Sequence, residues 1–284
     1  MGLQCQILLN KTRDGVYRPG QPVAGKVRYS VDKQTEFESI DILFVGKGKC
    51  QWTNIGGDTN SQSHYNKEKY ITLNKNLLTS VRGKTRLHQK GTYEYPFDFT
   101  LPESIPTSMK NKNCTIAYKL VIKFVKGNFF RSSKKIDTEI PNYSLYSMYV
   151  FSLTSKNDVN IKIEIERTFV APGDDIKLTL WIKNDSYVPI TTIKIELIKH
   201  FTYVSNTKRK FVATESIKST TGHSPSIKEN TESKLTCIIP TLPNLYSIQF
   251  TKILIGEYKV KVTAKFPFPH INASVEIPVV IGDR

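Results

Sequence analysis

Alternating apolar and polar positions run along most of the chain and are clearest in two neighbouring stretches. Aromatic or aliphatic side chains occupy the odd positions of residues 93–101 and the even positions of residues 116–124. Side chains of a strand point alternately to opposite faces, so each stretch would place its apolar residues on one face. Pro102 and Pro106 end the first stretch, because neither can donate a backbone hydrogen bond. The pattern predicts two β-strands that share one core.

Shorter alternating runs predict further strands in both halves of the chain, at residues 3–9, 27–31, 40–44, 70–72, 159–165, 176–182, 193–197, 258–262 and 275–279. Residues 53–67 are polar and rich in Gly, Asn and Ser, and they predict a surface loop. Residues 77–89 fit either a short helix or a basic loop, and residues 208–233 are mostly polar. Many short strands without sustained helical periodicity indicate an all-β fold of antiparallel β-sandwiches.

Three short segments occur twice in the same order, which indicates an internal duplication. They are a Pro-Gly turn, a pair of prolines and a Tyr-Lys step: residues 17–20 with 170–173, Pro102 and Pro106 with Pro240 and Pro243, and residues 118–120 with 258–260. A repeat of this length is too long for a solenoid, whose units run about 20–50 residues. The duplication predicts two tandem immunoglobulin-like domains, at residues 1–152 and 153–284.

Features of secretion and membrane insertion are missing from the 284 residues. No run of about 18 apolar residues occurs, and the N-terminus lacks the charged start and long apolar region of a signal peptide. The four cysteines, Cys5, Cys50, Cys114 and Cys237, form no Cys-x-x-Cys pair, which argues against zinc and redox motifs. We therefore expect a cytoplasmic protein in which all four cysteines are free thiols.

The formal charge of +16 is the strongest compositional indication of function. It is uneven, because residues 1–150 hold 23 Lys and Arg against 12 Asp and Glu, whereas residues 151–284 hold 18 against 13. A basic surface attracts phosphates, anionic lipid or acidic peptides. The other interpretation is a lysine-rich solvated surface. Nucleic acid is not an expected partner, because no motif for base reading occurs.

The residue types that catalysis requires are not gathered into a recognisable motif. The five histidines are isolated in the sequence, and neither a His-Glu-x-x-His motif nor a Gly-x-Ser-x-Gly motif occurs. Gly83-Lys84-Thr85 lacks the earlier glycine of a phosphate-binding loop, since that position is Leu78. We expect no enzymatic activity, no cofactor and no metal site.

One basic cluster follows the second alternating stretch. Lys119 and Lys123 fall on the face opposite the predicted core, and more cations follow them in the sequence: Lys126, Arg131, Lys134 and Lys135. Clusters of four to eight Lys and Arg near a bilayer can bind anionic lipid at about 1 kcal/mol each. These six residues form the predicted basic patch, for lipid or for another partner.

Several of these segments resemble the arrestin domains. Residues 16–27, residues 93–97 and the step Leu101-Pro102 are similar to the N-terminal arrestin domain, and Pro172-Gly173-Asp174 and residues 277–282 are similar to the C-terminal one. The two sets occur in the expected order and cover the whole chain. The resemblance is strongest to the α-arrestins, or arrestin domain-containing proteins, with an insect-like N-terminus.

The resemblance implies two curved sandwiches joined by a hinge, in a non-enzymatic intracellular adaptor. Such adaptors bind membrane-protein cargo, meaning receptors or transporters, and direct it to endocytosis and endosomal sorting. They recruit WW-domain ubiquitin ligases through Pro-Pro-x-Tyr motifs in a C-terminal tail. No such motif occurs in this sequence, so a ligase partner is expected only if a tail follows Arg284. The expected location is peripheral, at the plasma membrane and endosomes. A basic sandwich that binds anionic lipid or nucleic acid is the alternative.

The resemblance also bears on individual residues. Arg13 and Lys90 fall near places where phosphate-reading arrestins grip phosphorylated tails, so both are candidate contacts for phosphate or an acidic partner, with solvated surface as the alternative. The arginine of the polar-core switch of those proteins is matched by Glu166, which implies that the switch is absent. The thioredoxin-capturing cysteine of one relative is matched by Thr251, which makes thioredoxin an unexpected partner.

Overall fold

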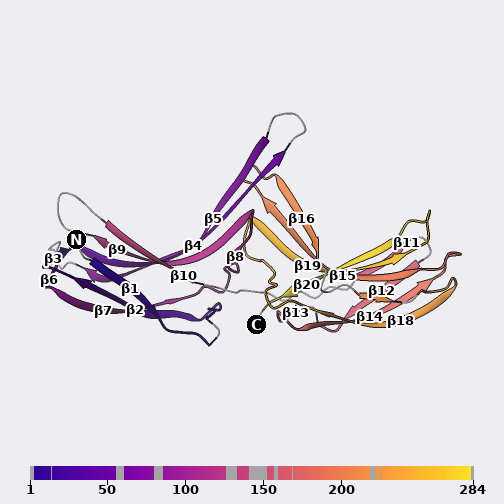
Figure 1. Cartoon of the computed structure of the whole chain (residues 1–284), viewed down its shortest axis with the longest axis horizontal. Coiled ribbons are helices and arrows are strands. Elements are labelled where there is room, and N and C mark those ends of the chain that lie inside the picture. Colours follow the sequence, from indigo (N-terminus) through magenta and orange to yellow (C-terminus); the bar gives the residue numbers. More distant parts are fainter. Residues whose placement is uncertain are drawn as a thin grey trace. The chain divides into compact units, whose positions relative to one another are not determined.

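The computed structural model describes residues 3–13, 15–55, 61–79, 86–125, 133–140, 152–156, 159–167, 169–217, 222–224 and 226–282. Every regular element in these ranges is a β-strand (Figure 1), which confirms the all-β prediction. The chain divides into two compact units. Unit 1 comprises Met1–Ser144, Ser205–Lys208 and Phe250–Ile253, and unit 2 comprises Leu145–Val204, Arg209–Gln249 and Leu254–Arg284.

Unit 1 contains three sheets. The three-stranded sheet has the order β1-β2-β7, with β1 at Leu3–Leu9, β2 at Pro22–Val31 and β7 at Gly91–Thr100. The five-stranded sheet has the order β10-β9-β4-β5, with β10 at Ser133–Ile140, β9 at Cys114–Val125, β4 at Ser39–Ile55, β5 at Ser61–Thr79 and β8 (Met109–Lys110) paired with β9. The third pairs β3 (Thr35–Phe37) with β6 (Arg86–His88).

The core of unit 1 is built by the alternation that the sequence shows. Every second side chain of β9 is buried, and the apolar residues of β7 lie on one face. Tyr118 of β9 is fully buried, and its hydroxyl donates a hydrogen bond to the Pro106 carbonyl at 2.7 Å. The Tyr29 ring of β2 packs edge-on against Phe124 of β9, with ring centroids 5.2 Å apart. The same Tyr29 ring stacks on Tyr93 and Tyr95 of β7, so the two predicted strands contribute to one core, as expected.

Unit 2 contains two sheets. The four-stranded sheet has the order β11-β12-β14-β18, with β11 at Ser152–Lys156, β12 at Val159–Ile165, β14 at Asp175–Asn184 and β18 at Thr231–Pro240. The six-stranded sheet has the order β13-β20-β19-β15-β16, with β13 at Phe169–Val170, β20 at Ala273–Ile281, β19 at Leu254–Lys265, β15 at Thr192–Val204, β16 at Lys210–Ser216 and β17 (Gly222–Ser224) paired with β15. Buried Ile, Leu and Val side chains from both sheets form its core.

The predicted duplication appears in both the sheet order and the turns. The order β10-β9-β4-β5 of unit 1 corresponds to β20-β19-β15-β16 of unit 2, and Tyr118 of β9 and Tyr258 of β19 are both buried. Gly20 and Gly173 have φ angles of 77° and 90°, the left-handed region that glycine adopts without strain. The Gly20 amide donates to the Leu101 carbonyl and the Gly173 amide to Thr241 Oγ1, each at 2.9 Å.

The predicted division at residues 152 and 153 stays a prediction, and residues 141–151, just before it, lie outside the described residues. The surface loop predicted at residues 53–67 is wrong for most of its length, because β4 continues to Ile55 and β5 begins at Ser61. The buried pair at this end of the hairpin is Trp52 and His64. Because His64 is polar, the sequence shows little apolar alternation there.

Two other stretches contain strands that the sequence did not predict. Residues 77–89 contain the end of β5 and the short β6, with residues 80–85 outside the described residues. The mostly polar residues 208–233 contain β16, β17 and the start of β18. These strands carry few buried side chains, so the period-two pattern of apolar residues is weak in them.

The expectation of four free thiols is wrong for two of them. Cys50 of β4 and Cys114 of β9 form a disulfide, whereas Cys5 and Cys237 keep their thiols. The two bonded cysteines lie directly opposite each other in the β4–β9 register and both face the core. Their separation of 64 residues conceals this proximity in the sequence.

Candidate interaction surfaces

The outward face of the five-stranded sheet of unit 1 carries part of the predicted basic patch. Lys119 and Lys123 alternate with the buried residues of β9 and therefore face away from the core. Asp41 of β4 lies directly opposite Lys123, and its carboxylate accepts hydrogen bonds from Ser39 Oγ and Asn76 Nδ2 at 2.8 and 2.7 Å.

The other four residues of that patch remain untested. Lys134 and Lys135 belong to β10, where their backbones pair with Phe124 and Lys123, and their side chains are outside the described part. Lys126 and Arg131 lie outside the described residues altogether.

A second group of cations on the same outward face was missed in the sequence. Lys47 pairs directly with Lys69, and Lys49 pairs directly with Lys67, across β4 and β5. Directly opposed residues of an antiparallel pair share one face. All four side chains are exposed, and none of the four ion-pairs with any described residue. We call Lys47, Lys49, Lys67 and Lys69 the lysine square.

Negative charge is directed away from the lysine square. Along the described residues 45–53 and 63–72, the only carboxylate is that of Glu68. Glu68 follows Lys67 and precedes Lys69, so its side chain points to the opposite face of the strand. There its carboxylate accepts hydrogen bonds from Thr251 Oγ1 at 2.9 Å and from the Lys252 amide at 2.8 Å.

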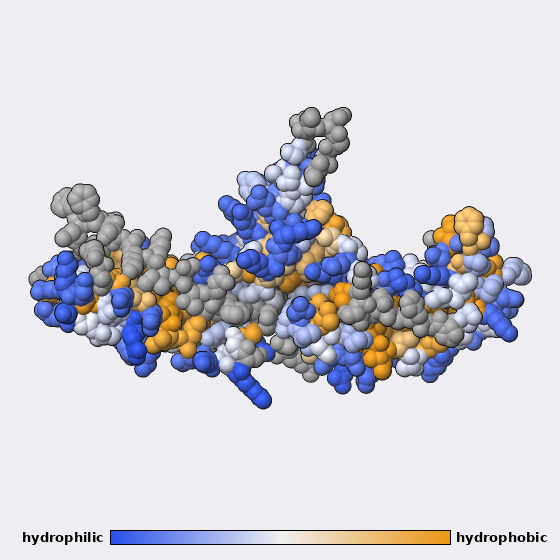
Figure 2. All heavy atoms as spheres, viewed as in Figure 1, coloured by the Kyte–Doolittle hydropathy of each residue, from blue (hydrophilic) through white to orange (hydrophobic). Residues whose placement is uncertain are grey.

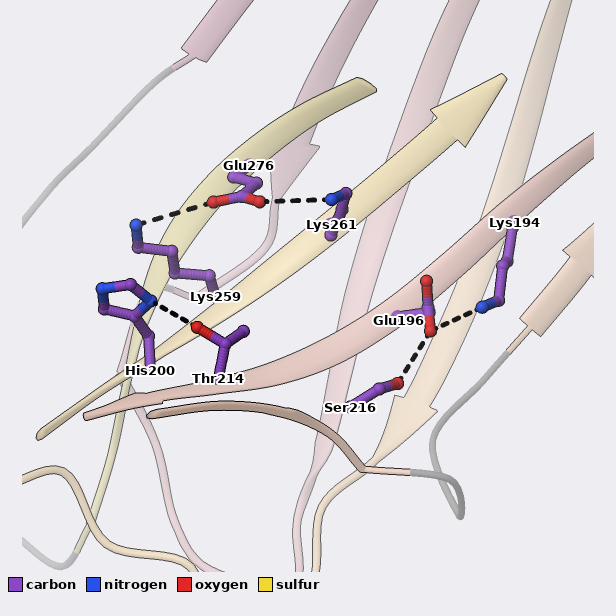
Figure 3. Close-up of polar contacts among 8 residues, drawn as sticks. All are labelled: Lys194, Glu196, His200, Thr214, Ser216, Lys259, Lys261 and Glu276. Carbon is purple, nitrogen blue, oxygen red and sulfur yellow. Dashed lines mark hydrogen bonds and ion pairs between the residues drawn. The ribbon is translucent and has the colours of Figure 1, made fainter. Parts of the chain in front are cut away.

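The equivalent face of unit 2 is charged as well, but three of its lysines lie next to carboxylates (Figure 3). Lys194 Nζ lies 2.7 Å from Glu196 Oε1, and Ser216 Oγ donates to the same oxygen at 2.7 Å. Burial raises the pKa of the Glu196 carboxyl, but the hydrogen bonds from Lys194 and Ser216 outweigh burial and hold that pKa below its ordinary value. Glu196 is therefore a carboxylate at neutral pH.

Glu276 forms ion pairs with two further lysines of this face. Its carboxylate lies 3.6 Å from Lys259 Nζ and 3.5 Å from Lys261 Nζ (Figure 3). Next to them, His200 Nδ1 and Thr214 Oγ1 form a 3.2 Å hydrogen bond across β15 and β16. On the outward face of unit 2, these two glutamates therefore pair with three of the lysines.

The structure places the two candidate phosphate contacts far apart. Arg13 is exposed beside an open hollow of about 840 Å³, lined also by Lys11 and Arg18, near the start of β2. Lys90 is exposed and precedes β7, whose first residue pairs with the last residue of β2. The ten residues of β2 therefore separate them by about 30 Å. Contact with phosphate stays a prediction for each residue.

The described residues do not assemble a catalytic or metal-binding cluster. Among them, no three His, Cys, Asp or Glu side chains gather as a metal site would require. His88 lies against the rings of Tyr29, Phe37 and Tyr93, and burial lowers the pKa of its imidazole. No helix in this part of the chain is both long and apolar enough to cross a membrane.

Two family models account for nearly the whole chain, in the order of its two sandwiches. The arrestin (or S-antigen) N-terminal domain matches residues 5–142, and the arrestin (or S-antigen) C-terminal domain matches residues 155–284. The chain belongs to the arrestin family. Its fold is the tandem arrestin β-sandwich, in agreement with the resemblance seen in the sequence.

Curated relatives of this arrestin are distant and of the arrestin domain-containing type. An arrestin domain-containing protein of Schizosaccharomyces pombe is 23% identical over 204 residues, which cover 67% of this chain and 32% of the relative. Human arrestin domain-containing protein 5 is 19% identical over 303 residues, 94% of this chain and 84% of the relative. Human thioredoxin-interacting protein is 24% identical over 228 residues, 73% and 56% respectively. These relatives agree with an α-arrestin-type protein.

Two positions singled out by the resemblance have ordinary structural partners in this arrestin. The Glu166 carboxylate lies 3.9 Å from Lys177 Nζ, and both side chains are more than half exposed. Thr251, at the position of the thioredoxin-capturing cysteine, shares a 2.9 Å hydrogen bond with the Tyr70 hydroxyl in addition to its bond with Glu68. The absence of the polar-core switch and of thioredoxin capture stay predictions.

Proposed function

We propose that this arrestin is a non-enzymatic adaptor of the α-arrestin type that binds membrane-protein cargo and directs its endocytosis or endosomal sorting. The observation that carries the proposal is the pair of arrestin domains, which match residues 5–142 and 155–284. Polar outward sheet faces and an open cationic hollow in unit 1 support a role in binding partners. The proposed location is the cytoplasmic side of the plasma membrane and endosomes.

The hollow beside Arg13 is the proposed contact for an acidic or phosphorylated segment of cargo. Lys11, Arg13 and Arg18 line it, and arginine presents paired N–H donors that match carboxylate and phosphate oxygens. Lys90 would extend the contact only for a segment that reaches the far end of β2, which requires roughly nine extended residues.

Recruitment of a ubiquitin ligase is a separate part of the proposal, and it depends on a motif outside these 284 residues. The 284 residues contain no Pro-Pro-x-Tyr sequence, so a WW-domain ligase would require such a motif elsewhere in the protein. Thioredoxin is not proposed as a partner, because Thr251 has no thiol with which to form a mixed disulfide.

A surface-proteome experiment tests the adaptor role. Cells depleted of the protein are labelled with a membrane-impermeant biotin reagent, and surface proteins are quantified with and without re-expression. We expect a defined set of receptors or transporters to accumulate on depletion and to return to normal with the wild-type protein. The same set should co-precipitate with it. If no membrane protein accumulates or co-precipitates, at low or at physiological salt, the adaptor role is wrong.

A pair of charge reversals tests the proposed contact. Arg13→Glu should leave the cargo set elevated, whereas the matched reversal Lys33→Glu, at an exposed position outside the hollow, should restore it. Equal rescue by both variants would remove Arg13 from the proposal and leave the adaptor role in place.

A further inference from the structure

The lysine square places like charges in the arrangement that is least favourable for a sheet. Lys47 faces Lys69 directly and Lys49 faces Lys67 directly, two residues further along β4. Like charges directly opposite each other destabilise a sheet. Along the described residues 45–53 and 63–72, no carboxylate on this face offsets them. Because this arrangement opposes folding, we expect the four charges to have a role in binding a partner.

The duplicated unit shows what the same positions hold when this charge is not required. With Tyr118 of β9 aligned to Tyr258 of β19, the pair Lys47–Lys69 corresponds to His200–Thr214. The His200 and Thr214 side chains hydrogen-bond to each other (Figure 3). The pair Lys49–Lys67 corresponds to Thr202–Val212, which carries no charge. The fold therefore does not demand lysine at these positions.

The chemistry of the square favours a distributed anionic surface over a single bound phosphate. All four residues are lysines, which act as point charges and lack the rigid fork with which arginine grips one phosphate or carboxylate. They stand on the exposed face of paired strands, whose backbone groups are already used in the sheet. Figure 2 shows hydrophilic side chains gathered along the hairpin of β4 and β5.

An aromatic residue extends this surface towards the tip of the hairpin. Tyr65 pairs with Gln51 next to the square, on the same outward face, and is 51% exposed. Tyrosine is enriched at the interface between bilayer and water. The β4–β9 pairing ends at Cys50, so β4 and β5 continue as a two-stranded hairpin (Figure 1). The square and Tyr65 thus lie on one accessible side of it.

We propose that the lysine square docks unit 1 on a bilayer that contains anionic lipid, with the four ammonium groups facing the headgroups. Adjacent backbone positions in the square are about 5 to 7 Å apart, less than the screening length of about 8 Å at physiological salt. The four charges therefore act together. Each lysine near an anionic bilayer strengthens binding several-fold, so all four correspond to about 100- to 1,000-fold. This site is distinct from the cargo contact at Arg13.

A vesicle partition experiment on the whole chain tests the site. The square variant carries Lys→Gln at Lys47, Lys49, Lys67 and Lys69; the matched control carries Lys→Gln at Lys33, Lys177, Lys183 and Lys228. Both variants lose four charges, and all eight lysines are exposed. The probes are vesicles of 30% phosphatidylserine in phosphatidylcholine, and vesicles of phosphatidylcholine alone. Wild-type protein should prefer the anionic vesicles at 50 mM salt, and the square variant should bind them about 100-fold or more weakly.

The matched control variant and two competing anionic ligands show whether vesicle binding is specific to the lysine square. The matched control should lose less than about tenfold, and the fold of each variant is verified by its urea transition. The proposal is overturned if both variants lose equally, if wild-type protein binds both vesicles alike, or if polyglutamate or a phosphoserine peptide binds the square more tightly than vesicles do. Cargo co-precipitation from detergent tests the adaptor role separately, since its failure with wild-type protein counts against that role alone. It should survive in the square variant, and its loss there alone would mean that the square binds cargo and would overturn the assignment to lipid.

Discussion

Removing the charges of the lysine square should make unit 1 more stable. Lys47 and Lys69 face each other directly, as do Lys49 and Lys67, and a directly opposed pair contributes about 0.2–1 kcal/mol in either direction. Replacing all four by Gln removes both repulsions and keeps most of each side chain's stem. We therefore expect the free energy of unfolding of unit 1 to rise by about 0.4–2 kcal/mol at low salt.

Tryptophan fluorescence can report this change for unit 1 alone. The chain has two tryptophans. Trp52 is buried in β4 of unit 1, and Trp181 lies in β14 of unit 2, with Lys162 Nζ 4.8 Å from its ring centroid. A Trp181→Phe background leaves Trp52 as the only reporter. Urea unfolding of this background, with and without the four Lys→Gln changes, should show a higher midpoint for the square variant.

Salt dependence separates charge repulsion from other causes. At 1 M salt the screening length is about 3 Å, shorter than the spacing of the opposed strands, so the difference between the two proteins should largely vanish. Of the matched control positions, Lys33 lies in unit 1, so Lys33→Gln in the same background should show no gain at either salt concentration. A square variant that is no more stable, or a gain that persists at 1 M salt, would refute the reasoning.

Three further predictions concern the core of unit 1 and the ion-paired face of unit 2. The double change Cys50→Ala and Cys114→Ala should lower the unfolding free energy of unit 1 by about 4 kcal/mol, the chain-entropy value for a 64-residue separation. Urea unfolding without reductant measures this loss, and an unchanged midpoint would contradict the disulfide. Tyr118→Phe removes a buried 2.7 Å hydrogen bond and should cost about 1 kcal/mol in the same assay, whereas no loss would mean that the bond contributes nothing. The pKa of Glu196 is lowered in the folded state, so its stabilisation is present above its ordinary value of 4.5 and is lost as the pH falls through the folded-state value. Glu196→Gln should therefore weaken the acid dependence of unit 2 unfolding, followed by Trp181 fluorescence, and an identical pH profile would argue against it.

The strands with a buried face could be predicted because a period of two leaves a direct mark on the sequence. Residues 93–101 and 116–124 each place large apolar side chains on every second position, and the structure buries most of them. The duplication could also be predicted from the sequence, because each sandwich needs a glycine with a left-handed backbone conformation before its second long strand. Gly20 and Gly173 meet that requirement in equivalent turns.

The remaining features depend on pairing between strands, which no single stretch of sequence contains. Residues 53–55 and 61–67 of the polar stretch are strand because β4 and β5 support each other as a hairpin, with Trp52 and His64 packed on one side. The disulfide required knowledge that Cys50 lies opposite Cys114. The lysine square required the same register, since Lys47 and Lys69 are distant in sequence and adjacent only after the hairpin forms. Arg13 and Lys90 failed to meet for the converse reason, because β2 separates them.

The two outward faces show how a duplicated fold can divide its electrostatic roles. In unit 2, Glu196 and Glu276 form ion pairs with three neighbouring lysines, and His200 hydrogen-bonds to Thr214, so this face offsets much of its own positive charge. In unit 1, the positions equivalent to His200 and Thr214 hold opposed lysines. If these lysines served only solubility, scattered exposed positions would serve equally well without repulsion. A stability gain that coincides with loss of vesicle binding in the square variant would show that unit 1 retains this repulsion for the sake of the membrane contact.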